Sequence, residues 1–265
     1  MLFRSDAERY VAGWPLEFHG TESGPLGALV VDDGVVIGQP VKPDDPALAA
    51  AGELSVLLQA RGVTVSGGVA HDVLPSGTES ILDVPSASVS SVVGEMLVNS
   101  DNNTAETLLK HIGLKGKGVG STANGLAVVA ETLAKWGVPG GWSMLDGSGL
   151  SSGNKFSCAL FDALLVRFES TFPGLMAVAG KSGTLREMFR DTPLEGLLVG
   201  KTGTLNGVKA LAGYVPIEGD EPVRFVLLLN KPGVDNKSAY RPIWSLLGDG
   251  LRRASAGPRA SDLAP

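Results

Sequence analysis

Residues 196–229, which read GLLVGKTGTLNGVKALAGYVPIEGDEPVRFVLLL, set the class of fold. From Gly196 onward the apolar residues follow the period of a strand instead of that of a helix. They predict three strands at residues 197–199, 208–215 and 223–229. The turns between these strands contain glycine or proline, which favours an antiparallel meander.

The middle of the chain has a helical pattern. Val89 opens an apolar stripe at positions i, i+3, i+4, i+7 and i+8, which predicts a helix ending at a short break over residues 99–102. A second helix is expected from Asn103 to a stop at Gly113. Further helices are expected at 46–59, 121–136, 158–168 and 238–253. The chain is therefore predicted to be an α+β protein with an antiparallel sheet flanked by helices.

Three further elements are expected towards the N-terminus. Residues 1–15 predict a short amphipathic helix that ends near Gly13. Two valine-rich runs on either side of Asp32-Asp33-Gly34 predict a β-hairpin, because Asp-Gly favours a tight turn. Residues 63–65 have the composition of a short strand.

Composition excludes several classes of protein. The 265 residues carry a net charge of -6, and no basic segment suits a nucleic-acid surface. Cys158 is the single cysteine, and the three histidines lie far apart, so neither a metal site nor another cofactor is expected. No apolar run approaches the length of a membrane span, and the charged N-terminus does not resemble a secretion signal.

Two Gly-Lys-Ser/Thr sequences, Gly180-Lys-Ser182 and Gly200-Lys-Thr202, invite comparison with phosphate-binding loops. Such a loop needs a glycine five positions earlier, where this chain has Leu175 and Glu195. The second sequence also lies on a predicted strand, whereas a phosphate loop opens a helix. Nucleotide binding is therefore rejected.

The informative pair of motifs is Ser100-Asp101-Asn102, in the break between two helices, and Lys201-Thr202-Gly203, on a strand. Ser-Asp-Asn and Lys-Thr-Gly are two of the three signatures of penicillin-binding proteins and β-lactamases. Each tripeptide alone is weak, because Ser100 could be an ordinary helix cap and Lys201 an ordinary strand lysine. Their order and their structural settings make the pair much more specific.

With the loop Asp146-Gly-Ser-Gly-Leu-Ser151 and the strand residues Leu211-Ala-Gly-Tyr214, these motifs resemble the D-alanyl-D-alanine carboxypeptidase/endopeptidase branch of the penicillin-binding proteins. The resemblance covers residues 44–253 and implies a β-lactamase/transpeptidase-like fold. It also implies a serine-type peptidase that acts on peptidoglycan peptides through an acyl-enzyme, without a cofactor.

The third signature of that family, Ser-x-x-Lys, is not found before Ser100. Its one formal match, Ser152-Gly-Asn-Lys155, has the wrong order for the family. We therefore expect an N-terminally incomplete peptidase domain at residues 41–254. Residues 1–40 would be the remnant of an inserted β-rich domain, and residues 255–265 a flexible tail. Lys181-Ser182-Gly183 imitates the Lys-Thr-Gly motif, but its setting predicts a turn.

The resemblance implies a role for each site residue. Ser100, Asn102 and Lys201 would be catalytic: Ser100 relays a proton, Asn102 orients the substrate amide and the lysine base, and Lys201 supplies positive charge. The substrate-binding residues would be Thr202, Gly203, Thr204 and Asp146. Thr202 would bind the terminal carboxylate, and the Thr204 N–H would be an oxyanion donor. Asp146 could instead only hold its own turn, and Cys158 is expected to be buried.

Two functions remain open from the sequence. The first is a D-Ala-D-Ala carboxypeptidase or endopeptidase that lies outside the cytoplasm and has its nucleophile on a missing segment or a complementing chain. Peptides ending in D-Ala-D-Ala would be its substrates, and β-lactams would bind once a nucleophile is supplied. The alternative is a non-catalytic module that binds such peptides in a degenerate cleft.

Overall fold

The computed structural model describes residues 5–27, 29–36, 38–72, 76–255 and 257. The chain forms two compact units. The first contains residues 1–88, 101–132 and 144–154, and the second contains residues 89–100, 133–143 and 155–265. Residues of the predicted tail lie almost entirely outside the described part of the chain.

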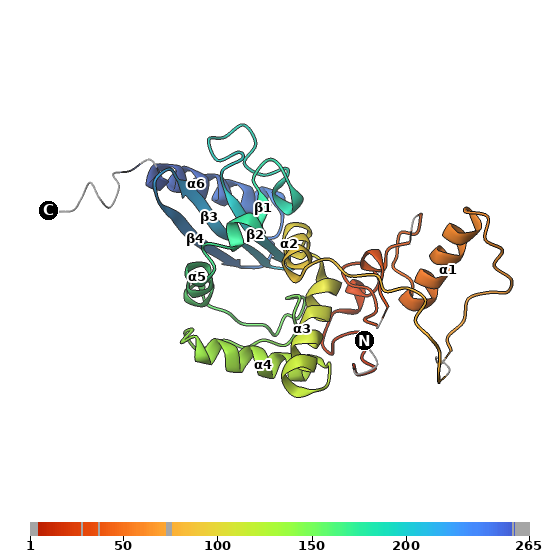
Figure 1. Ribbon diagram of the computed structural model, residues 1–265. Coiled ribbons are helices and arrows are strands. Elements are labelled where there is room, and N and C mark those ends of the chain that lie inside the picture. Colours follow the sequence, from red (N-terminus) through yellow and green to blue (C-terminus); the bar gives the residue numbers. More distant parts are fainter. Residues whose placement is uncertain (1–4, 28, 37, 73–75, 256, 258–265) are drawn as a thin grey trace. The chain divides into compact units, whose positions relative to one another are not determined.

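The second unit is built on a four-stranded antiparallel sheet with the strand order β1-β2-β3-β4 (Figure 1). The strands are β1 (Ala177–Val178), β2 (Val199–Leu205), β3 (Val208–Ile217) and β4 (Asp220–Asn230). Gly207 and Gly219 supply positive φ angles of 71° and 74° in the two hairpin loops. The predicted meander is confirmed, and the short strand β1 is added to it.

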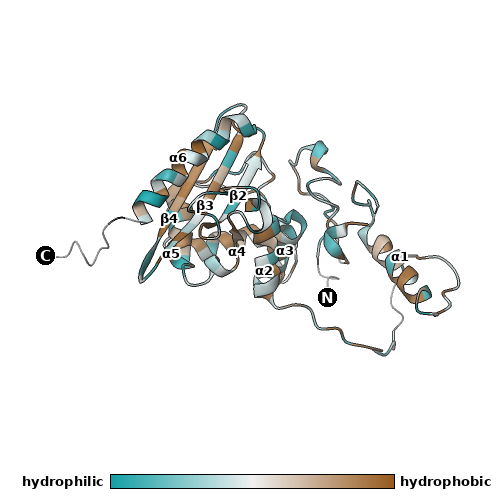
Figure 2. Ribbon diagram, turned by 90° about the horizontal axis from the view of Figure 1, so that it is seen from above, coloured by the Kyte–Doolittle hydropathy of each residue, from teal (hydrophilic) through white to brown (hydrophobic). Residues whose placement is uncertain are grey.

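Helices cover both faces of this sheet. Leu211 and Val215 of β3 belong to one apolar cluster with Tyr240 and Trp244 of α6 (Lys237–Ser255). Between them, Tyr214 points to the opposite face, because side chains alternate along a strand. There it joins a second cluster with Leu165 of α5 (Cys158–Arg167). Figure 2 shows apolar residues along the strands beneath α6. The two faces thus have separate cores.

The first unit is mainly helical. It contains α1 (Pro46–Gln59), α3 (Asn102–Lys117) and most of α4 (Thr122–Lys135). Helices α3 and α4 touch backbone to backbone, since a Cβ on Gly125 would lie 2.3 Å from the carbonyl oxygen of Leu109. Asp45 caps α1 by accepting a hydrogen bond from the Leu48 N–H, as expected for a helix with proline at its first position.

Several boundaries differ from the prediction. Helix α2 (Val89–Asn99) begins at the predicted residue, but α3 continues past Gly113 to Lys117, with the left-handed Gly118 as its cap. Gly113 is instead a contact point, because its Cβ would lie 2.7 Å from the Gly125 backbone nitrogen. A glycine that serves close helix packing resembles a helix stop in the sequence.

The three N-terminal elements are wrong. Residues 5–15 form bends and turns, because the Asp6 and Glu8 carboxylates bind Lys110 at 2.5 and 3.0 Å. Asp32–Gly34 is a 3-10 turn without flanking strands in the described residues, and Asp33 binds Lys42 at 2.6 Å. Residues 63–65 are irregular and follow the C-terminus of α1. Tertiary ion pairs override the local pattern in the first two cases.

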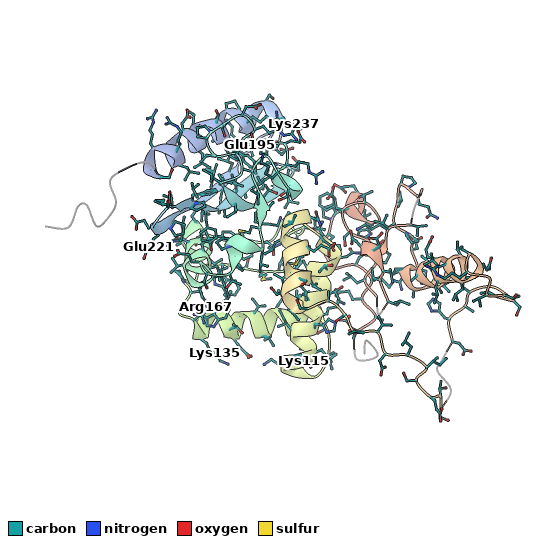
Figure 3. All side chains as sticks on the ribbon, turned by 45° about the horizontal axis from the view of Figure 1, so that its top comes forward. Lys115, Lys135, Arg167, Glu195, Glu221 and Lys237 are labelled. Atoms are coloured by element: carbon teal, nitrogen blue, oxygen red, sulfur yellow. The ribbon has the colours of Figure 1, made fainter. Side chains whose placement is uncertain are left out.

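The charged side chains labelled in Figure 3, such as Lys115, Lys135 and Glu221, project from the surface of their elements. No helix among the described residues is both long enough and apolar enough to cross a membrane.

Candidate active site

Ser100 follows directly after α2 and has an unusual backbone. Its φ angle is 61°, a left-handed conformation that costs a residue with a Cβ about 1 kcal/mol or more. Close packing fixes the end of α2 at this point, because a Cβ on Gly183 would lie 2.1 Å from the carbonyl oxygen of Val98. The fold thus holds the Ser100 hydroxyl in a defined place.

Lys201, on β2, meets that hydroxyl. Its Nζ donates one hydrogen bond to Ser100 Oγ at 2.7 Å and another to the carbonyl oxygen of Thr202 at 2.7 Å. These two residues stand 101 positions apart in the sequence, and the second unit brings them together. The contact joins one residue from each of the two predicted motifs.

The ammonium group of Lys201 is held in a poor environment for charge. Burial, and to a smaller extent the positive charge of Lys209, lowers its pKa from 10.5 to about 8. A lysine with a pKa near the working pH can both carry a charge and exchange a proton with a neighbouring hydroxyl. The Ser100–Lys201 pair therefore has the chemistry of a proton relay.

Thr202, Gly203 and Thr204 continue β2 beyond Lys201. Strand β1 pairs only with Val199 and Gly200, so the other edge of β2 from Lys201 onward has no strand partner among the described residues. A Cβ on Gly203 would meet only the Ala210 side chain, at 3.4 Å. Packing within the unit therefore does not require a glycine there, and its small size leaves room beside the strand.

Lys209 was not predicted from the sequence. It pairs with Thr204 in the β2–β3 register, and its Nζ donates a hydrogen bond to Thr204 Oγ1 at 2.7 Å. The side chain is only 8% exposed and lies 4.3 Å from the Tyr240 ring centroid. Burial lowers the pKa of Lys209 as well. In the sequence it looks like an ordinary strand lysine, and only the aromatic residues of α6 explain its burial.

We expect replacement of Lys209 by methionine to raise the pKa of Lys201. Methionine keeps the apolar stem but removes the like charge, so protonation of Lys201 becomes easier. The pKa should stay below 10.5, because burial is its larger cause. An NMR titration of the lysine Cε and Nζ signals measures it, with the exposed Lys237→Met as control. An unchanged Lys201 pKa would show that the two charges do not interact.

Asn102 belongs to the other compact unit. Its side-chain Nδ2 donates a hydrogen bond to the carbonyl oxygen of Glu22 at 2.8 Å. Asp101, not Ser100, caps α3 by accepting from the Thr104 N–H at 3.0 Å. The interpretation of Ser100 as a plain helix cap is therefore wrong, while the catalytic role of Asn102 stays a prediction.

Asp146 is buried at 1% exposure, and both of its oxygens are occupied. Oδ1 accepts from the Gly149 N–H and Asn154 Nδ2, and Oδ2 accepts from the Ser151 N–H and Trp14 Nε1, all within 2.9 Å. This is the geometry of a carboxylate that holds its own loop. Its role in substrate binding stays a prediction.

Glu106 is a second buried carboxylate that the sequence analysis missed. Its Oε1 accepts from the N–H groups of Gly147 and Ser148 at 2.9 and 2.8 Å, and the residue is fully buried. Burial raises its pKa. The spacing gave no signal, because 41 residues separate Glu106 from the loop it supports.

The two imitations of family motifs lie in other settings. Ser152 is exposed in a turn and does not begin a helix. Lys181 precedes the 3-10 turn Gly183–Leu185, as predicted, and binds Glu195, which is labelled in Figure 3. Cys158 is exposed at the start of α5, so its predicted burial is wrong. No group of three or more metal-ligating side chains occurs in the described part of the chain.

Comparison with protein families decides the relationship. The model of the D-Ala-D-Ala carboxypeptidase 3 (S13) family matches residues 27–246. The chain belongs to this family. The match includes Ser100-Asp101-Asn102, the loop at residues 146–151 and Lys201-Thr202-Gly203, so the predicted resemblance is confirmed.

Individual relatives of this S13 family protein support the same conclusion. A D-alanyl-D-alanine carboxypeptidase of Actinomadura sp. (strain R39) is 37% identical over 187 residues, covering 65% of this chain and 35% of the relative. Carboxypeptidase DacB of Mycolicibacterium smegmatis is 27% identical over 254 residues, covering 89% of this chain and 54% of the relative. The S13 chain thus spans about a third to a half of the lengths of these curated relatives.

Solved structures support the fold. Penicillin binding protein 4 of Haemophilus influenzae, complexed with a β-lactam, matches with a TM-score of 0.62 at 23% identity. The match covers 79% of this chain and 52% of that structure. The S13 chain therefore has the α+β, transpeptidase-like fold that the motifs predict.

Proposed function

We propose that this S13 chain supplies the Ser-Asp-Asn and Lys-Thr-Gly portion of a serine-type D-Ala-D-Ala peptidase that acts on peptidoglycan peptides. The observation that carries the proposal is the 2.7 Å hydrogen bond between Lys201 Nζ and Ser100 Oγ, with the Lys201 pKa lowered to about 8. Family membership supports the reaction class, and the two relatives named as carboxypeptidases support the substrate.

The unpaired edge of β2 suits an extended peptide. From Lys201 to Leu205 it offers backbone groups to which a substrate could add as a further strand. The terminal carboxylate would then lie near the ammonium of Lys201 and the hydroxyl of Thr202. The Thr204 N–H would stabilise the oxyanion that forms on the scissile carbonyl. Gly203 leaves the backbone open to close approach.

The reaction needs an attacking serine, which we assign to a Ser-x-x-Lys segment outside residues 1–265. Its hydroxyl oxygen would bond to the penultimate D-Ala carbonyl carbon while the peptide C–N bond breaks. The serine proton would pass through the Ser100–Lys201 pair to the leaving amine of the terminal D-Ala. Water would then hydrolyse the acyl-enzyme. Asn102 would orient the substrate amide from the start of α3.

A non-catalytic binding module is the second candidate. The observation in its favour is the position of Ser152, the single formal Ser-x-x-Lys serine, in an exposed turn away from any helix start. A chain with the Lys201 site and no activated nucleophile would bind a D-Ala-D-Ala end without cleaving it. In either case the substrate is a cell-wall peptide, so we propose a location outside the cytoplasm.

Intact mass spectrometry after incubation with benzylpenicillin tests the assignment of the nucleophile. We expect no penicilloyl adduct on folded residues 1–265. An adduct that disappears in Ser152→Ala would place the nucleophile within the chain and contradict the assignment. Mixing the chain with a Ser-x-x-Lys segment of the Actinomadura relative separates the two candidates. Acylation that depends on Lys201 supports the peptidase, and none supports the binding module.

A further inference from the structure

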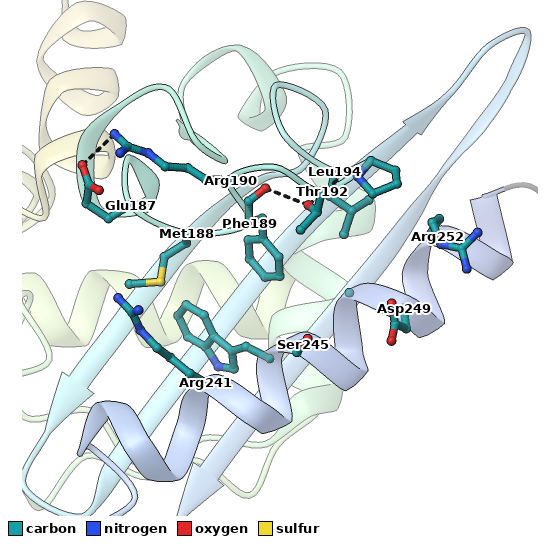
Figure 4. A pocket seen from close by; sticks show the side chains of 13 residues that line it. Glu187, Met188, Phe189, Arg190, Thr192, Leu194, Arg241, Ser245, Asp249 and Arg252 are labelled. Carbon is teal, nitrogen blue, oxygen red and sulfur yellow. Dashed lines mark hydrogen bonds and ion pairs between the residues drawn. The ribbon is translucent and has the colours of Figure 1, made fainter.

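A cavity of about 360 Å³ lies in the second unit between α6 and the segment 187–194 (Figure 4). It is formed on the side of α6 away from the sheet strands' hydrogen-bonded edge at Lys201, and it shares no lining residue with the Ser100–Lys201 pair. Its size is within the range of small-molecule sites. The mechanism proposed above does not use it.

One wall of the cavity is a stripe along α6. The lining residues recur every three or four positions, as one face of a helix requires: Arg241, Trp244, Ser245, Gly248, Asp249 and Arg252. The absence of a side chain at Gly248 lets the Phe189 ring approach, since a Cβ there would already lie 3.3 Å from it. The Phe189 and Trp244 rings are parallel within 2°. The cavity therefore has an aromatic wall.

The opposite wall is a loop with a costly but well-held backbone. Phe189 and Asp191 both have left-handed φ angles, of 57° and 56°. The loop is tied down by hydrogen bonds from Thr192 Oγ1 to the carbonyl oxygen of Phe189 at 2.7 Å and from the Asp191 N–H to Glu195 at 2.9 Å. Two strained residues in one short loop are typical of functional segments. The site is thus largely formed before any ligand binds.

The charges around the cavity are unequally partnered. Arg190 is bound to Glu187 at 2.7 Å, and Arg252 lies one helical turn from Asp249. Arg241 has no ion pair or hydrogen bond within the residues that the structure describes. Figure 4 shows it beside Met188, at the end of the cavity opposite to Asp249 and Arg252. One guanidinium is therefore free to bind an anion at the apolar end.

A buried hydrogen-bond donor is also unused. Trp244 is 3% exposed, and its Nε1 has no hydrogen-bond partner. An indole N–H without an acceptor costs about 1–3 kcal/mol when it is buried, so native proteins usually satisfy it. An acceptor on a ligand would remove this cost.

We propose that this cavity binds a small organic carboxylate with an aromatic or branched apolar body. The carboxylate pairs with Arg241, the body packs on Met188, Phe189 and Trp244, and Trp244 Nε1 gains an acceptor. A monoanion fits better than a phosphate dianion, because Glu187 and Asp249 also line the cavity. Arginine binds carboxylates through two parallel hydrogen bonds, which gives such a site its specificity.

The test is an NMR titration of the indole N–H signals of the full chain with 3-phenylpropionate. Trp244→Phe identifies the signal of Trp244 among the four tryptophans. We expect a saturable shift of that signal. The neutral 3-phenyl-1-propanol and the bare anion acetate should each bind about tenfold more weakly or worse, since each lacks one half of the recognition.

Matched variants locate the site. Ser245→Phe fills the cavity from an exposed position and should abolish the shift, whereas Leu246→Phe, on the next residue and outside the lining, should not. Arg241→Gln should reduce 3-phenylpropionate to the affinity of the alcohol. Equal binding of acid and alcohol, tighter binding of phenyl phosphate, persistence in Ser245→Phe, or no saturable shift would each overturn the proposal. Lys201→Met should leave this binding unchanged, which separates the result from the proposed peptidase site.

Discussion

Replacing Lys201 by methionine should weaken binding of a D-Ala-D-Ala peptide by at least about thirtyfold, which is about 2 kcal/mol. The part-buried ammonium, held by Ser100 Oγ and the Thr202 carbonyl oxygen, is the positive charge on the proposed carboxylate site. Methionine keeps the length and apolar stem, so the loss reports the charge. Calorimetric titration with diacetyl-Lys-D-Ala-D-Ala measures the change.

The sequence contains a matched control for this experiment. Lys181-Ser182-Gly183 has nearly the same letters, but Lys181 is 59% exposed and pairs with Glu195. We expect Lys181→Met to bind the peptide within about twofold of the unchanged chain, since exposed ion pairs contribute little. Equal loss in both lysine variants would show that the effect is non-specific and would contradict the assigned carboxylate site.

The same binding should depend on pH. Lys201 must be protonated to attract a carboxylate, and burial lowers its pKa to about 8. Affinity should therefore be greatest below pH 8 and fall as the pH rises through 8, not near 10.5 as for an exposed lysine.

Replacing Glu106 by leucine should destabilise the first unit by about 3 kcal/mol. The substitution leaves the N–H groups of Gly147 and Ser148 without their acceptor in a buried place, at about 1–3 kcal/mol each. Glu106→Gln keeps an acceptor oxygen and should stay within about 1 kcal/mol of the unchanged protein. Urea unfolding, with hydrogen exchange at Gly147 and Ser148, measures both variants.

The sign of the pH effect distinguishes a charge from a plain hydrogen-bond acceptor at this position. Burial raises the folded-state pKa of Glu106 above its ordinary value of 4.5. The folded state therefore holds this proton more tightly, and the associated stability, present below pH 4.5, is lost as the pH rises through the raised pKa. In Glu106→Gln this dependence should vanish. An identical pH profile in both proteins would contradict burial as the cause.

Elements with a strong local pattern could be predicted from the sequence. The meander after Gly196 and the helix at Val89 are set by alternating or helical runs of apolar residues, and both are confirmed. The hairpin expected at Asp32–Gly34 failed, because Asp33 serves an ion pair with Lys42 that is formed only in the folded unit. Local patterns report local preferences, and long-range polar contacts can outweigh them.

The site divides in the same way. Ser100 and Lys201 could be found from the sequence, because each sits in a short motif of known chemistry. Lys209 and Glu106 could not, because neither has a motif: one is defined by a cross-strand neighbour and the aromatic residues of α6, the other by a loop 41 residues away. Residues that tune or support a site carry no signature of their own when the contacts are distant in sequence.

The left-handed backbone at Ser100 sets stability against chemistry at a single position. Glycine adopts that φ angle without a steric penalty, so Ser100→Gly would relieve strain while deleting the hydroxyl that Lys201 contacts. A selection for thermal stability alone would thus favour a variant without the relay. Serine persists at this position only where its hydroxyl is under selection, and related chains with glycine there can be sorted as sequences that have given up the reaction.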